Sequence, residues 1–141
     1  MIDKKVILDS GPLVAFLNKS DRYHKWAVTQ FSQMRVPFYT CESVISESSF
    51  LLRNYKNGTA NIFKLLDRDL IKIQFNLDDE INAIKNLLDK YGDIPMSLAD
   101  SCLVRMSEKI TNSIICTLDS DFKIYRKAKR KLISIIIPKD L

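Results

Sequence analysis

Two continuous apolar runs in the C-terminal third of the chain constrain its fold more than any other feature. They cover residues 113–118 and 133–137, and each is only a few residues long. Short uninterrupted apolar runs are typical of strands that are buried on both faces, as in a parallel sheet covered by helices. We therefore expect both runs to be strands of such a sheet.

The remaining patterns place helices between strands. Further strands are expected over residues 4–8, 36–40 and 70–75. Apolar spacing and helix start and stop signals predict helices over residues 13–18, 23–34, 43–55, 59–66, 78–91 and 97–109. Strands that alternate with helices predict a three-layer α/β/α sandwich with a central, mostly parallel sheet.

Length and composition are those of an ordinary globular protein. The 141 residues fit a single domain, residues 1–141, with 46% hydrophobic and 28% charged residues. No apolar run is long enough to cross a membrane and the N-terminus lacks a secretory signal, so we expect a cytoplasmic protein. The three cysteines are odd in number and far apart, which favours core positions over disulfides or a zinc site.

The positive charge of the chain is concentrated in one segment. The chain has 22 Lys and Arg against 17 Asp and Glu, a net charge of +5. Six of the basic residues lie within nine positions that hold no acid, namely Lys123, Arg126, Lys127, Lys129, Arg130 and Lys131. Such a local patch suits a polyanion such as a nucleic acid. The alternative is a solvated surface near the C-terminus.

Several acidic residues lie where carboxylates are not expected to face solvent. Asp9 follows the first strand, and Asp119 and Asp121 follow a later one. Open parallel sheets form their sites beyond these strand ends. Glu47 and Asp100 lie along the apolar stripes of their helices. Inward carboxylates are unfavourable unless they are paired or bind a cation.

Each acid also has a purely structural alternative. Asp9 or Asp119 could cap a helix, and Asp100 could form a capping box with Ser97. Glu47 could pair with a buried arginine. The candidates for this arginine are Arg53 and Arg105. Together, however, carboxylates around one crevice would repel one another unless a divalent cation neutralised them. Oxygen ligands without His or Cys favour Mg²⁺ or Mn²⁺.

Four short motifs give the sequence a resemblance to a known family. They are residues 9–14 (DSGPLV), 44–47 (VISE), 98–100 (LAD) and 117–122 (TLDSDF). In this order the chain resembles a PIN domain, and more narrowly the VapC-type ribonuclease toxins of toxin–antitoxin pairs. Residues 21–27 (DRYHKWA) and the pair Tyr125-Arg126 are similar to that branch. The resemblance covers nearly the whole chain, and its specificity lies in the order of the motifs.

The resemblance implies a Mg²⁺- or Mn²⁺-dependent endoribonuclease that hydrolyses RNA with a metal-activated water. It carries over Asp9, Glu47 and Asp100 as the main acidic triad, with Asp119 or Asp121 as the fourth acid. Only one residue separates the last two acids here, which is closer than is common in PIN domains, so which of them faces the metal stays open. The resemblance also implies an antitoxin partner and a homodimer.

Further residues are candidates for contacts with RNA. Ser10 and Thr117 could position a water or a phosphate, or serve as turn and cap residues. Arg126 could contact a phosphate or form a salt bridge with Asp121. The residues expected to bind the RNA backbone are Lys127, Lys129, Arg130 and Lys131. The single histidine, His24, is expected to be a structural or rim residue and not a catalytic one.

Other functions fit the same patterns less well. A response-regulator receiver domain is also α/β with clustered acids, but it needs adjacent acids at the first strand and a lysine at the last. Here Ser10 follows Asp9, and the last strand ends in Pro138. A housekeeping RNA-processing nuclease and a PIN-like RNA-binding module that no longer cleaves RNA remain alternatives.

Overall fold

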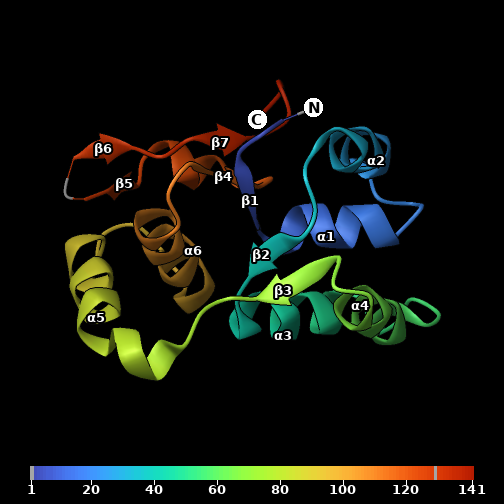
Figure 1. Cartoon of the computed structure of the whole chain (residues 1–141), viewed down its shortest axis with the longest axis horizontal. Coiled ribbons are helices and arrows are strands. Elements are labelled where there is room, and N and C mark those ends of the chain that lie inside the picture. The colour runs from blue at the N-terminus through green and yellow to red at the C-terminus, as the bar shows by residue number, and fades with distance from the viewer. Residues whose placement is uncertain (1, 129) are drawn as a thin grey trace.

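The main sheet of the chain is parallel throughout. The computed structural model describes residues 2–128 and 130–141. The strands lie in the order β3–β2–β1–β4–β7, and neighbours pair in parallel (Figure 1). They are β1 (Lys5–Leu8), β2 (Phe38–Thr40), β3 (Ile71–Ile73), β4 (Ser113–Cys116) and β7 (Ile135–Ile136).

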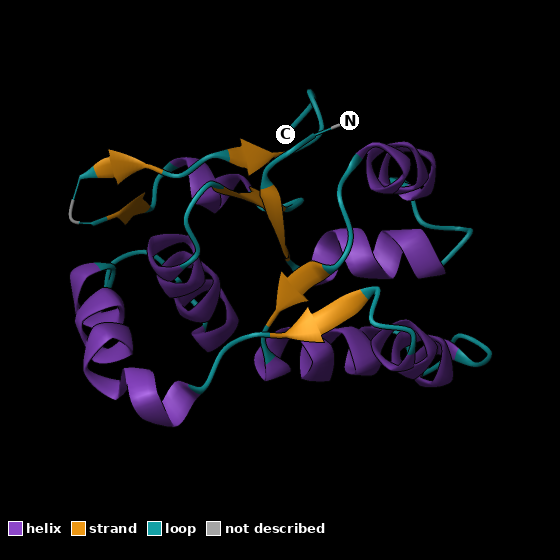
Figure 2. Cartoon of the chain, in the orientation of Figure 1, coloured by secondary structure: helices purple, strands orange, loops and turns teal. Residues whose placement is uncertain are grey.

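Helices cover both faces of this sheet (Figure 2). They are α1 (Ser10–Leu17), α2 (His24–Gln33), α3 (Glu42–Leu51), α4 (Gly58–Asp67), α5 (Ile81–Lys90) and α6 (Leu98–Lys109). One hydrophobic cluster joins the sheet to α1, α2 and α4, and a second joins it to α5 and α6. Helix α3 contributes side chains to both clusters. The predicted three-layer arrangement is therefore confirmed.

The alternation of side chains along β1 explains why this strand must be central. Val6 and Leu8 belong to the cluster with α1, α2 and α4, whereas Ile7 belongs to the cluster with α5 and α6. All three are fully buried. Successive side chains of a strand point to opposite faces, so an uninterrupted apolar run requires cover on both sides.

The last apolar run departs from its prediction. Residues 133–137 were expected to be buried on both faces, but β7 lies at the edge of the sheet beside β4, and Ile135 and Ile136 are only partly buried. Ile135 packs against one hydrophobic cluster and Ile136 against the other, so both faces of β7 are covered as predicted, but incompletely, because an edge strand has a neighbouring strand on one side only.

The basic segment also forms an element that the sequence did not predict. It folds into an antiparallel hairpin of β5 (Arg126–Lys127) and β6 (Lys131–Leu132). The turn includes Ala128, whose φ of 45° lies in the left-handed region.

The connection between α3 and α4 depends on one glycine. The helix predicted over residues 43–55 ends at Leu51, and α4 begins at Gly58. A Cβ atom at Gly58 would lie 2.5 Å from the carbonyl oxygen of Leu52. The two helices therefore approach one another at a separation that only glycine permits.

Two simpler expectations can be compared directly. Cys41, Cys102 and Cys116 are buried free thiols, as predicted. Within residues 2–128 and 130–141, no helix is both long enough and apolar enough to span a membrane.

Candidate functional site

A cleft opens at the carboxyl ends of β1 and β4, bordered by α3 and α6. Its volume is about 530 Å³. The residues that line it are Asp9, Ser10, Gly11, Glu47, Leu51, Pro95, Ser97, Asp100, Leu118, Asp119 and Ser120. Four of the predicted acids, which come from four separate segments of the chain, thus line the same cleft.

Asp9 is fixed at the end of β1 by hydrogen bonds to both carboxylate oxygens. Oδ1 accepts from the backbone N–H of Ser10 at 2.7 Å, which makes Asp9 the N-cap of α1. Oδ2 accepts from the Thr117 hydroxyl at 2.7 Å. Burial raises the pKa of Asp9 from 3.8 to about 6; the two hydrogen bonds oppose this rise, and the charges of Asp100 and Glu47 add to it.

Ser10 and Thr117 differ in how they relate to the cleft. Ser10 is buried and lines it, and supplies the backbone N–H to Asp9. Thr117 is fully buried, and its hydroxyl also accepts from the backbone N–H of Asp119 at 2.9 Å. Thr117 therefore positions two acids of the cleft at once.

Asp100 lies in the first turn of α6 and forms the predicted capping box. Its backbone N–H donates to Ser97 Oγ at 3.0 Å, while the Ser97 backbone N–H donates to Asp100 Oδ2 at 3.5 Å. Burial is the main cause that raises the pKa of Asp100, followed by the charge of Asp119. Hydrogen bonds from Tyr125 and Ser97 act in the opposite direction.

Tyr125 is a site residue whose role the sequence did not reveal. Its hydroxyl donates to Asp100 Oδ2 at 3.1 Å, and its ring is fully buried. It packs edge-on against Tyr91 and Phe122, with ring centroids 5.1 and 5.3 Å away. Burial and the charge of Asp100 raise the pKa of Tyr125, which keeps the hydroxyl protonated as a donor. The sequence offered only the resemblance of the pair Tyr125-Arg126 to VapC-type toxins, which names the residue but not its contact with Asp100.

The two acids after β4, Asp119 and Asp121, differ in whether they line the cleft. Asp119 lines the cleft, and its Oδ1 accepts from the backbone N–H of Asp121 at 2.8 Å. It thereby caps the short 3-10 helix η2 (Ser120–Lys123). Asp121 does not occur among the described residues that line the cleft. Of this pair, Asp119 is the acid that the fold brings to the other three.

Glu47 reaches the cleft, but not from a buried position. Its side chain is exposed, whereas Val44 and Ser48 of the same helix are fully buried. The prediction of an inward-pointing Glu47 is wrong because the core-facing stripe of α3 passes beside it. Arg105, considered as a partner, instead pairs with Glu80 at 2.8 Å.

The carboxylates share the cleft without converging on one point. In the part of the chain that the structure describes, no three His, Cys, Asp or Glu side chains are grouped closely enough to hold a metal ion. The donor chemistry nevertheless suits a hard cation, because the described lining offers carboxylates and hydroxyls and no Lys or Arg. Their mutual repulsion contributes to the raised pKa values of Asp9 and Asp100.

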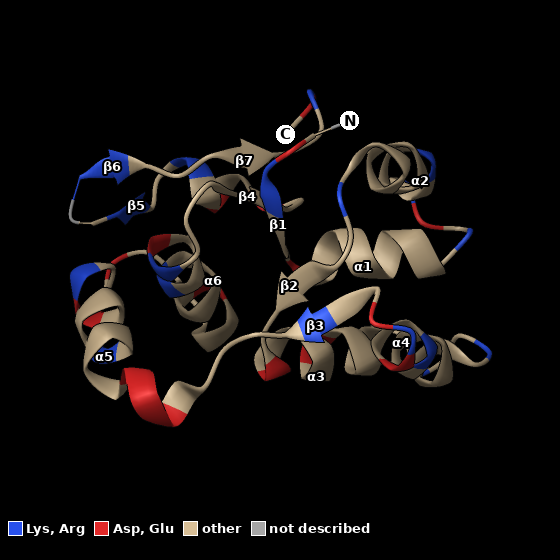
Figure 3. Ribbon diagram, in the orientation of Figure 1, with Lys and Arg blue, Asp and Glu red and all other residues tan. Residues whose placement is uncertain are grey.

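The basic hairpin runs away from the cleft along α6. At the cleft end Tyr125 contacts Asp100, and at the far end the Ala128 backbone N–H donates to Glu108 Oε2 at 2.6 Å. Between Asp100 and Glu108 a helix rises by about 12 Å. Figure 3 shows Lys and Arg in blue on β5 and β6, at the side of the molecule where α5 and α6 lie. The predicted RNA-contact residues of the hairpin are Lys127, Arg130 and Lys131, while Lys129 lies outside the described residues.

Arg126 is used locally. Its guanidinium Nη1 donates to the carbonyl oxygens of Lys123, Ile124 and Tyr125 at 2.7, 2.8 and 3.0 Å. These bonds shape the turn that leads into β5. The salt bridge to Asp121 considered from the sequence is not among the ion pairs of the described residues.

His24 has the structural role predicted for it. Its ring Nδ1 lies 2.8 Å from the carbonyl oxygen of Ala15. The ring thus links the start of α2 to α1.

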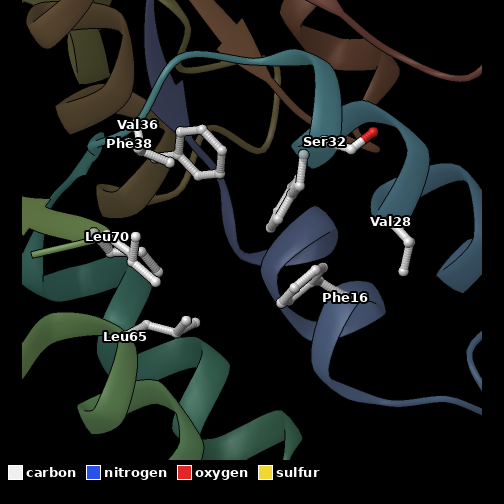
Figure 4. Close-up of a pocket in the computed structure, with 9 residues that line it drawn as sticks. Phe16, Val28, Ser32, Val36, Phe38, Leu65 and Leu70 are labelled. Carbon is white, nitrogen blue, oxygen red and sulfur yellow. The ribbon is translucent and has the colours of Figure 1, made fainter. Parts of the chain in front are cut away.

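A second concavity is apolar. It has a volume of about 330 Å³. It is lined by Phe16, Val28, Phe31, Ser32, Val36, Phe38, Leu65, Leu70 and Ile71 (Figure 4). Val28 and Val36 are 42% and 49% exposed at its border. The described lining carries no charged side chain, so it suits the apolar side chains of another molecule better than a nucleic acid.

Comparison with known proteins identifies the fold. No family model matches the sequence, and no curated protein matches it. Among solved structures, VapC20 of Mycobacterium tuberculosis, a toxin that cleaves the sarcin–ricin loop, matches with a TM-score of 0.76 at 15% sequence identity. The match covers 85% of this chain and 94% of that chain. The PIN-like α/β/α fold expected from the motifs is confirmed.

Proposed function

We propose that this chain, which shares the fold of the toxin VapC20, is a divalent-metal-dependent endoribonuclease that acts as the toxin of a toxin–antitoxin pair. The observation that carries the proposal is the cleft at the carboxyl ends of β1 and β4, which is lined by acids from four separate segments. Buried and repelling carboxylates are typical of a site that is completed by a cation.

The residues that would hold Mg²⁺ or Mn²⁺ are Asp9, Glu47, Asp100 and Asp119. Such an ion, when bound, lowers the pKa of water and neutralises charge on a phosphodiester. The chain's own groups orient the ligands. Thr117 holds Asp9 by a hydrogen bond to Oδ2, and Tyr125 holds Asp100. Glu47 is exposed and free of the core, so it can turn toward an ion without repacking.

The direct test is incubation of the purified chain with total RNA, with and without Mn²⁺. We expect cleavage that needs the metal and that Asp100→Asn abolishes. Asp89→Asn, an exposed position on α5, is the matched control and should cleave like the wild type. Binding without cleavage of any RNA would favour the non-catalytic RNA-binding module.

The basic hairpin supports RNA as the substrate. Each phosphate contact that is lost should reduce the salt dependence of binding to single-stranded RNA by about 0.7 in the logarithmic slope. We therefore expect a flatter slope when four residues are changed together to Gln, namely Lys127, Lys129, Arg130 and Lys131. The control changes four exposed basic residues on or beside α1, α2 and α4, at the opposite side from the hairpin in Figure 1, namely Lys19, Lys25, Lys64 and Arg68. An equal effect of both sets would remove the hairpin from the proposal.

A protein partner is the second part of the proposal. The apolar groove between α1, α2 and α4 offers a surface that an antitoxin segment could cover. Expression of the chain alone should arrest growth, and co-expression with its antitoxin should relieve the arrest. A housekeeping nuclease would not arrest growth. The homodimer implied by the resemblance is tested by light scattering of the purified chain.

A further inference from the structure

An exposed aromatic side chain lies on α3 beside two residues that line the acidic cleft, Glu47 and Leu51. Phe50 follows Glu47 by three residues on α3, so the two side chains are neighbours on the helix surface. Leu51, next to Phe50, lines the cleft and is itself 52% exposed. The Phe50 side chain is 61% exposed and is not part of the buried core, so packing in the core does not explain an aromatic residue at this position.

Phe50 is paired with a cation. The guanidinium carbon of Arg53 lies 3.9 Å from the centroid of the Phe50 ring, and Arg53 Nη1 donates to the Phe50 carbonyl oxygen at 2.8 Å. Among the described residues Arg53 forms no ion pair. One ring face is therefore covered by a guanidinium that retains its charge and most of its five N–H donors.

We propose that Phe50 and Arg53 form a platform on which an unpaired nucleobase of the RNA substrate stacks beside the cleft. Bases of any sequence stack on aromatic rings, and the free face of Phe50 offers such a surface. Arg53 supplies a positive charge at the edge of a cleft whose carboxylates repel phosphates. The inference rests on the proposed function, and it adds a preference for single-stranded RNA at the cut site.

Another exposed phenylalanine provides a matched control. Phe63 on α4 is 56% exposed, close to the value for Phe50. It lines a different concavity, together with Leu66, Asp67 and Ile71. Neither ring is among the described residues that line the acidic cleft, but only Phe50 is next to one of them, Leu51, on its helix. Replacing either ring by alanine removes a similar exposed apolar area. A difference in RNA binding between the two variants therefore depends on where each ring lies.

The test measures binding of a short fluorescein-labelled single-stranded oligoribonucleotide by anisotropy, in EDTA so that it is not cleaved. Phe50→Ala and Phe50→Leu should both weaken binding about 5- to 100-fold. Phe50→Trp should bind at least as well as the wild type, and its added indole fluorescence should be quenched by the RNA. Phe63→Ala should bind like the wild type, and Arg53→Gln should lower the salt slope by about 0.7.

Three results would overturn the inference. If Phe50→Leu binds like the wild type, a ring is not required and no base stacks there. If Phe50→Ala changes the oligomeric state in light scattering but not RNA binding, the ring belongs to a contact between copies of the chain. If the wild type neither binds nor cleaves RNA, the proposed function fails and takes this inference with it. A wild type that cleaves, beside an unaffected Phe50→Leu, refutes the platform alone.

Discussion

Replacement of Asp9 by asparagine should make the protein more stable at neutral pH and not at acidic pH. The pKa of Asp9 is 3.8 when exposed in the unfolded chain and about 6 in the fold, mainly because of burial. Well below pH 3.8 the carboxyl is protonated in both states and contributes no pH dependence. Above about pH 6 it is ionised in both states, and folding then includes the transfer of a charge into the cleft. Stability is therefore lost as the pH rises through this window.

The size of the effect follows from the two pKa values. Their difference of about 2.2 corresponds to about 3 kcal/mol at pH 7.5, and to about 0.2 kcal/mol at pH 3.5. Asparagine keeps an oxygen that can accept from the Ser10 backbone N–H, as Asp9 Oδ1 does at 2.7 Å. It loses the carboxylate acceptor of the Thr117 hydroxyl, at a cost of about 1 kcal/mol. The net gain at pH 7.5 is about 2 kcal/mol.

Urea unfolding of Asp9→Asn and wild type, without metal, at pH 3.5 and 7.5 measures this difference. Other titrating groups are shared by both proteins and largely cancel in the comparison. Asp89→Asn, at an exposed position, should show no such change. If the free energies of unfolding of Asp9→Asn and the wild type differ by the same amount at both pH values, the fold does not raise the pKa of Asp9 and the reasoning is refuted. Added Mn²⁺ should stabilise the wild type at pH 7.5 more than the variant.

Three further predictions concern the support of the cleft, the helix connection and the reaction. Tyr125→Phe removes the hydroxyl that donates to Asp100 and should lower the free energy of unfolding by about 1–2 kcal/mol in urea titration; an unchanged value would show that the bond does not contribute. Gly58→Ala should destabilise by about 1–3 kcal/mol because its Cβ meets the Leu52 carbonyl, whereas Gly92→Ala, with its nearest atom at 3.5 Å, should be nearly neutral in the same assay. Cleaved RNA should carry 5′-phosphate and 3′-hydroxyl ends by end-labelling; 2′,3′-cyclic phosphates would contradict a metal-activated water.

The sheet was predictable because its signal is local and strong. Residues 6–8 are apolar without interruption, and the two clusters on either face require that pattern. The hairpin was not predictable for equally local reasons. Its strands hold two residues each, too few for an alternation, and Ala128 occupies the left-handed conformation where Gly or Asn would have signalled the turn. The hairpin also relies on a long-range bond to Glu108.

The sequence predicted which acids line the cleft, but not the exposure of Glu47 or the hydrogen bond from Tyr125 to Asp100. Strand ends and helix spacing were enough to gather the acids, since parallel strands bring their carboxyl ends to one edge. The exposure of Glu47 was missed because its neighbours Val44 and Ser48 made the stripe look wider than it is. The donor to Asp100 was missed because a tyrosine 25 positions later carries no pattern that points to it.

Capping and cleft formation, which appeared as alternatives in the sequence, occur together in the structure. Asp9, Asp100 and Asp119 each accept a backbone N–H at the start of a helix and also line the cleft. The N-terminal ends of helices carry partial positive charge, which offsets part of the repulsion between these acids. The backbone hydrogen bond fixes where each carboxylate lies. Because the described cleft lining holds no Lys or Arg, each carboxylate remains available to a cation. Asparagine caps a helix as well as aspartate does. An Asp-to-Asn change at Asp9 or Asp119, the two N-cap positions, therefore separates the two roles, because it keeps the cap at the helix start and removes the charge.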